Sequence, residues 1–358
     1  ETRAERTRVL LSDSWRIRQL DGGEPDTDAL TRQALAADSE WLAVRQMPAQ
    51  VHDVLLDHGM ISDARVGKNA AECTWVGEKD WVYACTFPNP SHINGPVFLC
   101  FDGLDTLAMA YLNGQRIATF DNMYRAYRVD IRDKLNSTKR PNVLLIVFTS
   151  VQRYLEQLDV PERFGDVNKA HFLRKCHSDF GSYLGARPNS IKVGVFRDVY
   201  LDIPDRSWIQ NVWVRPKLSS NLERAQIHTR LELVGPAVSC DLTLRGPSGR
   251  RISKVSFPDA DKIIESVIDV DNAQLWWPRT HGKQPMYKLD VAIRHQERLL
   301  ETRTIEFGLR DVQPVLRDEE TGEKRFRFDV NGQPVFMRGA DLAPLEGPTH
   351  CWNDERAM

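Results

Sequence analysis

The sequence has no run of about 18 apolar residues, the length that a helix needs to cross a bilayer. Its N-terminus begins with charged residues and lacks the apolar core of a signal peptide. An excess of charge of one sign is also missing, because 48 basic side chains face 50 acidic ones and the formal net charge is −2. We therefore expect neither a membrane nor a nucleic acid as a partner.

Cysteine is scarce: the chain has six, and none stands in a CxxC spacing. The nine histidines show no HExxH motif or other ligand spacing. These absences argue against a structural zinc site and a thioredoxin-type redox pair, and we expect no metal or cofactor. Buried free thiols are the expected state, which indicates a reducing compartment and predicts a cytoplasmic protein. The sequon at Asn136 is the one hint of secretion, and it is short enough to arise by chance.

What the chain does contain is many short strand signals and little helical periodicity. A hydrophobic content of 41% with 27% charged residues is typical of a soluble globular protein, and 358 residues are enough for two or three domains. One helix is predicted around residues 50–57, where Val51, Val54 and Leu55 have helical spacing and Gly59 follows. The predicted fold class is mainly β.

The first region is predicted to be a jelly-roll sandwich. Asn113-Gly114 tolerates the positive φ of a type I′ turn, so residues 107–120 read as a β-hairpin. The unbroken apolar run at residues 143–148 is expected of a strand that is covered on both faces. Further strand signals lie at residues 15–18, 80–87 and 96–101.

A second strand-rich region of about 100 residues begins near Trp208, which is the size of an immunoglobulin-like sandwich. It has no cysteine pair around a central tryptophan, so we expect no antibody-type disulfide. Trp276-Trp277 resembles a sugar platform, but its place at a strand edge favours packing. The strand signals lie at residues 209–214, 225–234, 240–244, 264–270, 286–293 and 302–307.

A third region begins near Val312 and contains a second Asn-Gly hairpin, at residues 325–338. Asn353 and the acidic residues after it are a good start for a helix, but the chain stops within about two turns. So short a helix has no face to bury, which predicts a truncation. The predicted domains are residues 1–205, 206–311 and 312–358, with the first boundary marked by Pro204.

Several of these stretches together resemble the β-mannosidases of glycoside hydrolase family 2, in the order in which that family has them. The block from residue 103 to residue 124 is the most specific match. The matching stretches are residues 47–52 (MPAQVH), 75–81 (WVGEKDW), 103–106 (GLDT), 111–114 (YLNG), 121–124 (DNMY), 275–278 (LWWP), 282–287 (GKQPMY), 306–310 (EFGLR), 330–332 (VNG) and 338–340 (RGA).

The resemblance implies a jelly-roll sugar-binding domain, an immunoglobulin-like domain and a (β/α)₈ barrel that carries two catalytic glutamates. Such a barrel needs roughly 250 residues, and only 46 follow Val312. Retaining hydrolysis needs two carboxyl groups about 5–5.5 Å apart, and no Asp or Glu here is assigned to either role. We expect the fragment to be inactive, with a carbohydrate substrate and its own barrel as partners in the full-length chain.

In that family a loop of the first domain reaches the pocket of the barrel, and residues 174–187 match it. The relatives usually have tryptophan, aspartate and tryptophan where this chain has Ser182-Tyr183-Leu184. The difference removes one carboxylate and two aromatic faces. Asp179, Tyr183 and Arg187 are the groups in this loop that are able to hydrogen-bond to a sugar. A loop that is ordered by packing alone remains the alternative.

A second set of candidate residues follows the expected first barrel strand, whose C-terminal end faces the active site in this fold. Asp341 stands where the relatives have asparagine, Leu342 where they have tryptophan, and Glu346 at an acidic position. Carboxylates there could accept hydrogen bonds from sugar hydroxyls, although solvated loop acids are the alternative. His350 and Trp352 are close enough in sequence to line the same mouth.

The leading hypothesis is a retaining, exo-acting glycosidase of the β-mannosidase type that lacks its catalytic barrel here. A second hypothesis is another family 2 activity, such as a β-galactosidase, β-glucuronidase or exo-β-glucosaminidase, which the altered loop keeps open. A third, from a different class, is a non-catalytic carbohydrate-binding module made of two β-sandwiches.

Overall fold

The computed structural model describes residues 6–36, 39–64, 66–91, 93–137, 139–165, 168–180, 191–317 and 321–340. Contacts along the chain divide it into two units, with the division between Ile203 and Pro204. We describe each unit by itself. No helix among the described residues is long and apolar enough to span a bilayer.

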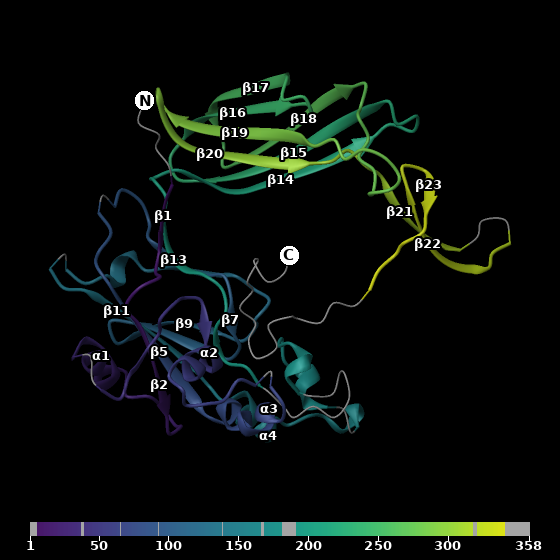
Figure 1. Cartoon of the computed structure of the whole chain (residues 1–358). Coiled ribbons are helices and arrows are strands. Elements are labelled where there is room, and N and C mark those ends of the chain that lie inside the picture. Colours follow the sequence, from purple (N-terminus) through teal and green to yellow (C-terminus); the bar gives the residue numbers. More distant parts are fainter. Residues whose placement is uncertain are drawn as a thin grey trace. The chain divides into compact units, whose positions relative to one another are not determined.

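The first unit consists of antiparallel sheets, as expected for a sandwich (Figure 1). One sheet has six strands in the order β3-β2-β5-β11-β8-β9, a second has the order β1-β13-β6-β10, and a small third one has the order β4-β12-β7. The strands are β1 (Thr7–Leu10), β2 (Trp15–Leu20), β3 (Leu42–Ala43), β4 (Ala49–Gln50), β5 (Asp80–Phe87), β6 (Phe98–Phe101), β7 (Leu104–Asp105), β8 (Ala108–Leu112), β9 (Gln115–Phe120), β10 (Tyr127–Asp130), β11 (Asn142–Phe148), β12 (Gly194–Val195) and β13 (Val199–Ile203).

Strand β11 is buried along its whole length, as its unbroken apolar run predicts. Successive side chains of a strand point to opposite faces, so the run supplies two layers. Three of its residues join the main sandwich core: Leu144, Ile146 and Phe148. The other three pack against Leu30 and Ala34 of a covering helix, α1 (Thr27–Ala36): Val143, Leu145 and Val147.

Short helices fill the connections of this unit. The predicted helix is present as α2 (Val51–Asp57). Helix α1 was not predicted, and it begins after Asp26, whose Oδ1 accepts a hydrogen bond from the Ala29 amide at 2.9 Å. The remaining helical turns are α3 (Asn69–Glu72), η1 (Thr74–Glu78), η2 (Arg132–Lys134), α4 (Val151–Gln157), η3 (Glu162–Phe164), η4 (Lys169–Phe172) and η5 (His177–Phe180).

Both predicted Asn-Gly hairpins are confirmed. Asn113 and Gly114 have φ values of 54° and 83° and connect β8 to β9. Asn331 and Gly332 have φ values of 50° and 74° and connect β22 (Lys324–Val330) to β23 (Gln333–Val335). Positive φ at both central residues is the requirement of a type I′ turn, and its twist matches that of the strands it joins.

The second unit contains a sandwich of two antiparallel sheets, with the orders β14-β15-β18 and β17-β16-β19-β20 (Figure 1). Buried, inward-facing residues alternate with half-buried or exposed ones along β15 and β16, and the inward ones form a continuous core. The strands are β14 (Trp208–Leu218), β15 (Arg224–Val234), β16 (Val238–Arg245), β17 (Arg251–Ala260), β18 (Ile263–Asp271), β19 (Tyr287–His295) and β20 (Arg298–Phe307).

A three-stranded sheet follows the sandwich: β21 (Val312–Arg317), β22 (Lys324–Val330) and β23 (Gln333–Val335). Both of its pairings are antiparallel, whereas the strands of a (β/α)₈ barrel are parallel. The predicted mainly β class is confirmed, but within the described residues no barrel strand is seen. The start of a barrel in residues 312–358 stays a prediction, because residues 341–358 lie outside the described residues.

The tryptophans of the family-like motifs serve packing. Trp81 is buried, and its Nε1 donates to the Val76 carbonyl at 3.0 Å. Trp276 lies against Gly308, where an added Cβ would come within 2.8 Å of its ring, and the guanidinium carbon of Arg310 is 4.6 Å from its ring centroid. A ring covered on these sides is part of the fold, as the position at a strand edge predicts.

Candidate functional site

The stretch that matches the pocket-reaching loop of the family is described at both of its ends, residues 174–180 and 191–195. At the first end Arg174 forms a parallel bridge with Asn122, and its carbonyl accepts a hydrogen bond from the Met123 amide at 3.0 Å. At the second end the Val193 carbonyl accepts from the Val51 amide at 2.9 Å, and β12 then pairs with β4 and β7. Each end is therefore held by backbone hydrogen bonds to the first unit.

Between these two ends lies a buried cluster of four charged side chains, Asp105, Lys175, Asp179 and Lys192, which we call the ionic cluster. The Lys175 Nζ lies 2.5 Å from Asp105 Oδ1 and 2.7 Å from Asp179 Oδ2. The Lys192 Nζ lies 2.6 Å from the other oxygen of Asp179. None of the four residues is more than 5% exposed. Two positive and two negative charges balance within the cluster.

Neutral groups complete the coordination of the ionic cluster. Lys175 Nζ also donates to the Lys192 carbonyl at 2.8 Å, so one side chain joins both ends of the loop. Asp105 accepts from Gln50 Nε2 at 3.0 Å and from the Thr106 hydroxyl. Burying charges costs several kcal/mol per ion, and close pairing with further hydrogen bonds is needed to offset it. This many short contacts meet that need.

The electrostatics of the ionic cluster keep Lys175 charged. Burial disfavours the charged form of its amine, but the carboxylates of Asp105 and Asp179 outweigh burial and raise the pKa of Lys175 above its ordinary value. The amine therefore remains a charged ammonium over the pH range in which proteins are usually folded, and it holds two carboxylates together.

His52 lies near the ionic cluster and is in the opposite state. It is 1% exposed, and neither ring nitrogen has a hydrogen-bond partner within the part of the chain that the structure describes. Burial, together with the positive charge of Lys192, lowers the pKa of His52 to about 4, although Asp179 opposes the shift. The imidazole is therefore neutral in the folded protein at pH 7.

We expect the free energy of unfolding to decrease by about 2 kcal/mol between pH 7 and pH 4.5 through His52 alone. The unfolded chain takes up the proton near pH 6.5, whereas the folded chain takes it up only near pH 4. Stability is thus complete above pH 6.5 and is lost as the pH falls towards 4. Urea unfolding of the wild type and of His52→Leu at both pH values measures this decrease in the free energy of unfolding. Equal losses in the two proteins would contradict the assignment.

The predicted substrate-binding residues fall into two groups. Asp179 is described, and it is fully buried with each carboxylate oxygen near a lysine of the ionic cluster. That Asp179 contacts a sugar stays a prediction. Its buried position also supports the alternative, in which Asp179 packs the base of the loop. The others lie outside the described residues, and their roles stay predictions: Tyr183, Arg187, Asp341, Glu346 and Trp352, with His350 beside the last.

The ionic cluster itself was not predicted. Lys175 and Asp179 have the i, i+4 spacing of a helical ion pair, which is a weak signal. Their burial depends on Asp105 and Lys192, which come from distant parts of the sequence. A local pattern does not reveal such a meeting.

The arrangement of potential metal ligands and thiols is known for the described part of the chain. It contains no group of three or more His, Cys, Asp or Glu side chains that could hold a metal ion. The five cysteines that are described are free, and four of them are buried. Burial raises the pKa of Cys85 and of Cys240 to about 12, which keeps these thiols protonated and unreactive.

Comparisons with known proteins bear on the two sandwiches. A family model described as the glycosyl hydrolase 2 galactose-binding domain-like matches residues 15–197, which is more than half of the chain. A second model, glycosyl hydrolases family 2, matches residues 208–310. The two matched regions correspond to the two sandwiches described above.

Individual proteins resemble the chain along nearly its whole length. β-Mannosidase B of Emericella nidulans is 29% identical over 352 residues, covering 95% of this chain and 39% of that protein. The crystal structure of β-D-mannosidase from Dictyoglomus thermophilum has a TM-score of 0.77 at 24% identity, covering 94% of this chain and 40% of that one. The exo-chitosanase of Amycolatopsis orientalis has a TM-score of 0.70 at 19% identity, covering 98% of this chain and 38% of that one.

The chain thus spans about 39% of the length of the first relative, and the match includes 95% of the chain. Its two sandwiches, their order and the motifs at residues 103–124 and 275–287 agree with one family throughout. The chain belongs to glycosyl hydrolase family 2.

Proposed function

We propose that the chain is the N-terminal portion of a retaining, exo-acting glycosidase that removes terminal β-mannosyl residues. The observation that carries the proposal is the 29% identity to a protein named β-mannosidase B over 95% of this chain. In this proposal the two catalytic carboxylates, about 5–5.5 Å apart in a retaining enzyme, lie in a barrel beyond residue 358. The 358 residues alone are then inactive.

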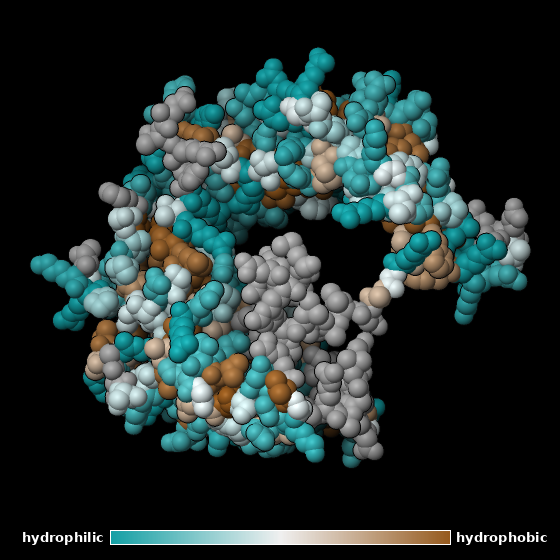
Figure 2. Space-filling model, viewed as in Figure 1, coloured by the Kyte–Doolittle hydropathy of each residue, from teal (hydrophilic) through white to brown (hydrophobic). Residues whose placement is uncertain are grey.

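The sheet β21–β22–β23 supports the proposal of a further domain. Phe326 is 76% exposed and Phe336 is 80% exposed, and Leu316 of β21 is exposed as well. In Figure 2 the surface of the described residues is largely hydrophilic, with apolar residues at this sheet. A surface of large apolar side chains on so small a sheet indicates a contact area, and we propose that the catalytic barrel covers it.

We further propose that the loop between the two ends held by the ionic cluster contributes to the sugar pocket. Lys175 and Lys192 fix the start and the return of the loop by contacts of 2.7 Å and 2.6 Å with Asp179. A rigid base is what a loop needs if it is to place side chains with the accuracy that binding requires. Tyr183 and Arg187 in the loop, and Asp341, Glu346 and Trp352 after β23, are the proposed sugar contacts.

Two other functions are alternatives to a β-mannosidase, and both can be tested. The similarity in fold to an exo-chitosanase, at 19% identity, keeps another family 2 specificity as the second candidate. A non-catalytic binding module is the third. For the compartment we propose the cytoplasm, because the described cysteines are free thiols. A fluorescent fusion that enters the secretory pathway would contradict this.

A panel of aryl β-glycosides tests the specificity on the protein encoded by the whole gene. We expect hydrolysis of the β-mannoside to exceed that of the β-galactoside, β-glucuronide and β-glucosaminide in kcat/KM. Tyr183→Ala should lower kcat/KM by up to roughly tenfold, the loss of one hydrogen bond to the sugar. A preference for another glycoside would replace mannose in the proposal. Unchanged kinetics with a large fall in Tm would assign Tyr183 to packing.

A further inference from the structure

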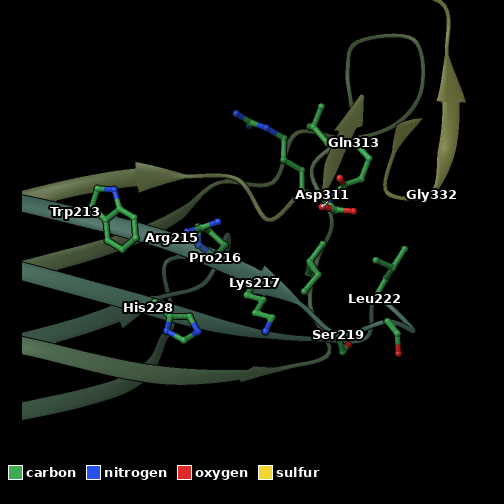
Figure 3. Close-up of a pocket in the computed structure, with 14 residues that line it drawn as sticks. Trp213, Arg215, Pro216, Lys217, Ser219, Leu222, His228, Asp311, Gln313 and Gly332 are labelled. Carbon is green, nitrogen blue, oxygen red and sulfur yellow. Dashed lines mark hydrogen bonds between the residues drawn. The ribbon is translucent and has the colours of Figure 1, made fainter. Parts of the chain in front are cut away.

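The second unit has a groove of about 880 Å³ at the end of β14 (Figure 3). One wall is the outward face of β14 and β15, and the other is formed by residues 310–313, which lead into β21. The groove is held in shape by Asn331, which is 3% exposed. Its side chain accepts from the Asp311 amide at 2.9 Å and donates to the Trp276 carbonyl at 3.0 Å.

The groove carries an excess of positive charge. Three cationic side chains line it, Arg215, Lys217 and Arg310, against one carboxylate, that of Asp311. Asp311 already accepts a hydrogen bond from Gln313 Nε2 at 2.8 Å. Within the described residues, none of the three cations has an ion-pair partner.

Other arginines on the same sheet are neutralised. Arg230 lies 2.8 Å from Glu265, and Arg224 lies 3.2 Å from Asp271. Arg215 and Lys217 face His228 and Gln226 across the strand pair, where no carboxylate is available. The sheet therefore pairs its cations everywhere except at the groove, and this difference indicates a site for an anion.

The spacing along β14 adds an aromatic surface to the two cations. Trp213, Arg215 and Lys217 are alternate residues on the exposed face of the strand, so their side chains stand about 7 Å apart in a row. Trp213 is 47% exposed. His228, opposite Arg215, has an Nε2 atom that is buried without a hydrogen-bond partner among the described residues.

We propose that this groove binds an acidic carbohydrate, an oligosaccharide that carries carboxylate groups. The indole of Trp213 supplies a flat apolar face for one sugar ring. Arg215 and Lys217 lie further along the same row of side chains. They supply charge-assisted hydrogen bonds to the carboxylates of the next one or two sugar units. His228 Nε2 supplies a partner for one hydroxyl group. The proposal goes beyond the hydrolytic function and does not depend on which glycoside the whole protein cleaves.

Isothermal titration of the 358-residue chain tests the proposal with three probes: trigalacturonate, a neutral galactose trisaccharide and sodium sulfate. We expect trigalacturonate to bind at least tenfold more tightly than either of the others, with an affinity that falls as salt is added. Equal binding of the neutral sugar would overturn the role of the cations. Equal binding of sulfate would overturn the role of the sugar, and no binding of any probe would overturn the site.

Substitutions of groove residues test whether trigalacturonate binds in the groove. Lys217→Gln and Trp213→Ala should each weaken trigalacturonate binding by roughly tenfold. The matched control is Lys254→Gln, since Lys254 lies on β17 in the other sheet and pairs with Asp241 at 3.1 Å. Its affinity should equal that of the wild type. The same loss in all three variants, or in none, would contradict the assignment. Circular dichroism of each variant confirms that it is folded.

Discussion

Replacing Lys175 by methionine is expected to lower the free energy of unfolding of the first unit by about 3–5 kcal/mol, which is the typical cost of removing one partner from a buried ion pair. The ammonium of Lys175 contacts Asp105 at 2.5 Å and Asp179 at 2.7 Å, and all three side chains are fully buried. Without it, the cluster keeps two carboxylates and one cation. Urea unfolding of the wild type and the variant measures the loss.

The matched control for this experiment is Lys134→Met, because Lys134 is an exposed lysine of the same unit. Its cost should stay within about 0.5 kcal/mol. The double variant Lys175→Met/Asp105→Asn restores the balance of charge and should recover part of the loss. A cost below about 1 kcal/mol for Lys175→Met would mean that the lysine contributes no more than a surface pair.

Gly194→Ala is expected to be about as damaging, at roughly 3 kcal/mol, from backbone strain and overpacking together. Gly194 has a φ of +130°, a region that L side chains rarely adopt, and it pairs with both Gln50 and Asp105 in the small sheet. An added Cβ would lie 2.2 Å from the Tyr83 hydroxyl oxygen and 3.0 Å from the Gln50 Cα. The substitution therefore disturbs the strand on which the loop returns.

Two further variants separate strain from crowding. Gly59 has a φ of +68° and nothing within 4 Å of an added Cβ, so Gly59→Ala should show the cost of strain alone, about 1–2 kcal/mol. Tyr83→Phe removes the atom that clashes, and combined with Gly194→Ala it should recover part of the loss. Thermal unfolding that shifts equally for Gly194→Ala and Gly59→Ala would contradict the crowding.

Local signals were enough to predict the parts of the fold that depend on neighbours in sequence. The Asn113-Gly114 turn requires only its two residues to adopt a positive φ, and it was predicted with its strands. The buried run of β11 was predicted because six consecutive apolar residues leave no face for water. The sequence predicted that both faces of this strand are covered, but it did not identify the element that covers the second face. In the structure that element is α1.

Elements with weaker periodicity were missed. Helix α1 buries only Leu30 and Ala34 over ten residues, so its apolar stripe is too narrow to stand out. Its sequence signal is the cap at Asp26. Strand β17 buries only Ala260 fully, and its half-buried residues alternate with polar ones. Both elements lie at the surface, where burial leaves little pattern in the sequence.

The candidate site was harder still, because it is assembled from distant segments. The resemblance selected the loop that contains Asp179 but gave no sign that its carboxylate is buried between two lysines. That arrangement needs β7, with Asp105, to lie beside β12 at the return of the loop. Such contacts between segments about 70 residues apart depend on the sheet order, which a strand pattern does not determine.

The central proposal is that hydrolysis needs a catalytic barrel in addition to the two sandwiches. Its most direct test is hydrolysis of 4-nitrophenyl β-D-mannoside by two proteins at equal concentration, the 358-residue chain and the protein encoded by the whole gene. We expect turnover by the whole protein only, because in our proposal the two catalytic carboxylates belong to a barrel domain and not to the two sandwiches. Turnover by the purified 358-residue chain above the rate in buffer would contradict this, and it would place the chemistry within the two sandwiches.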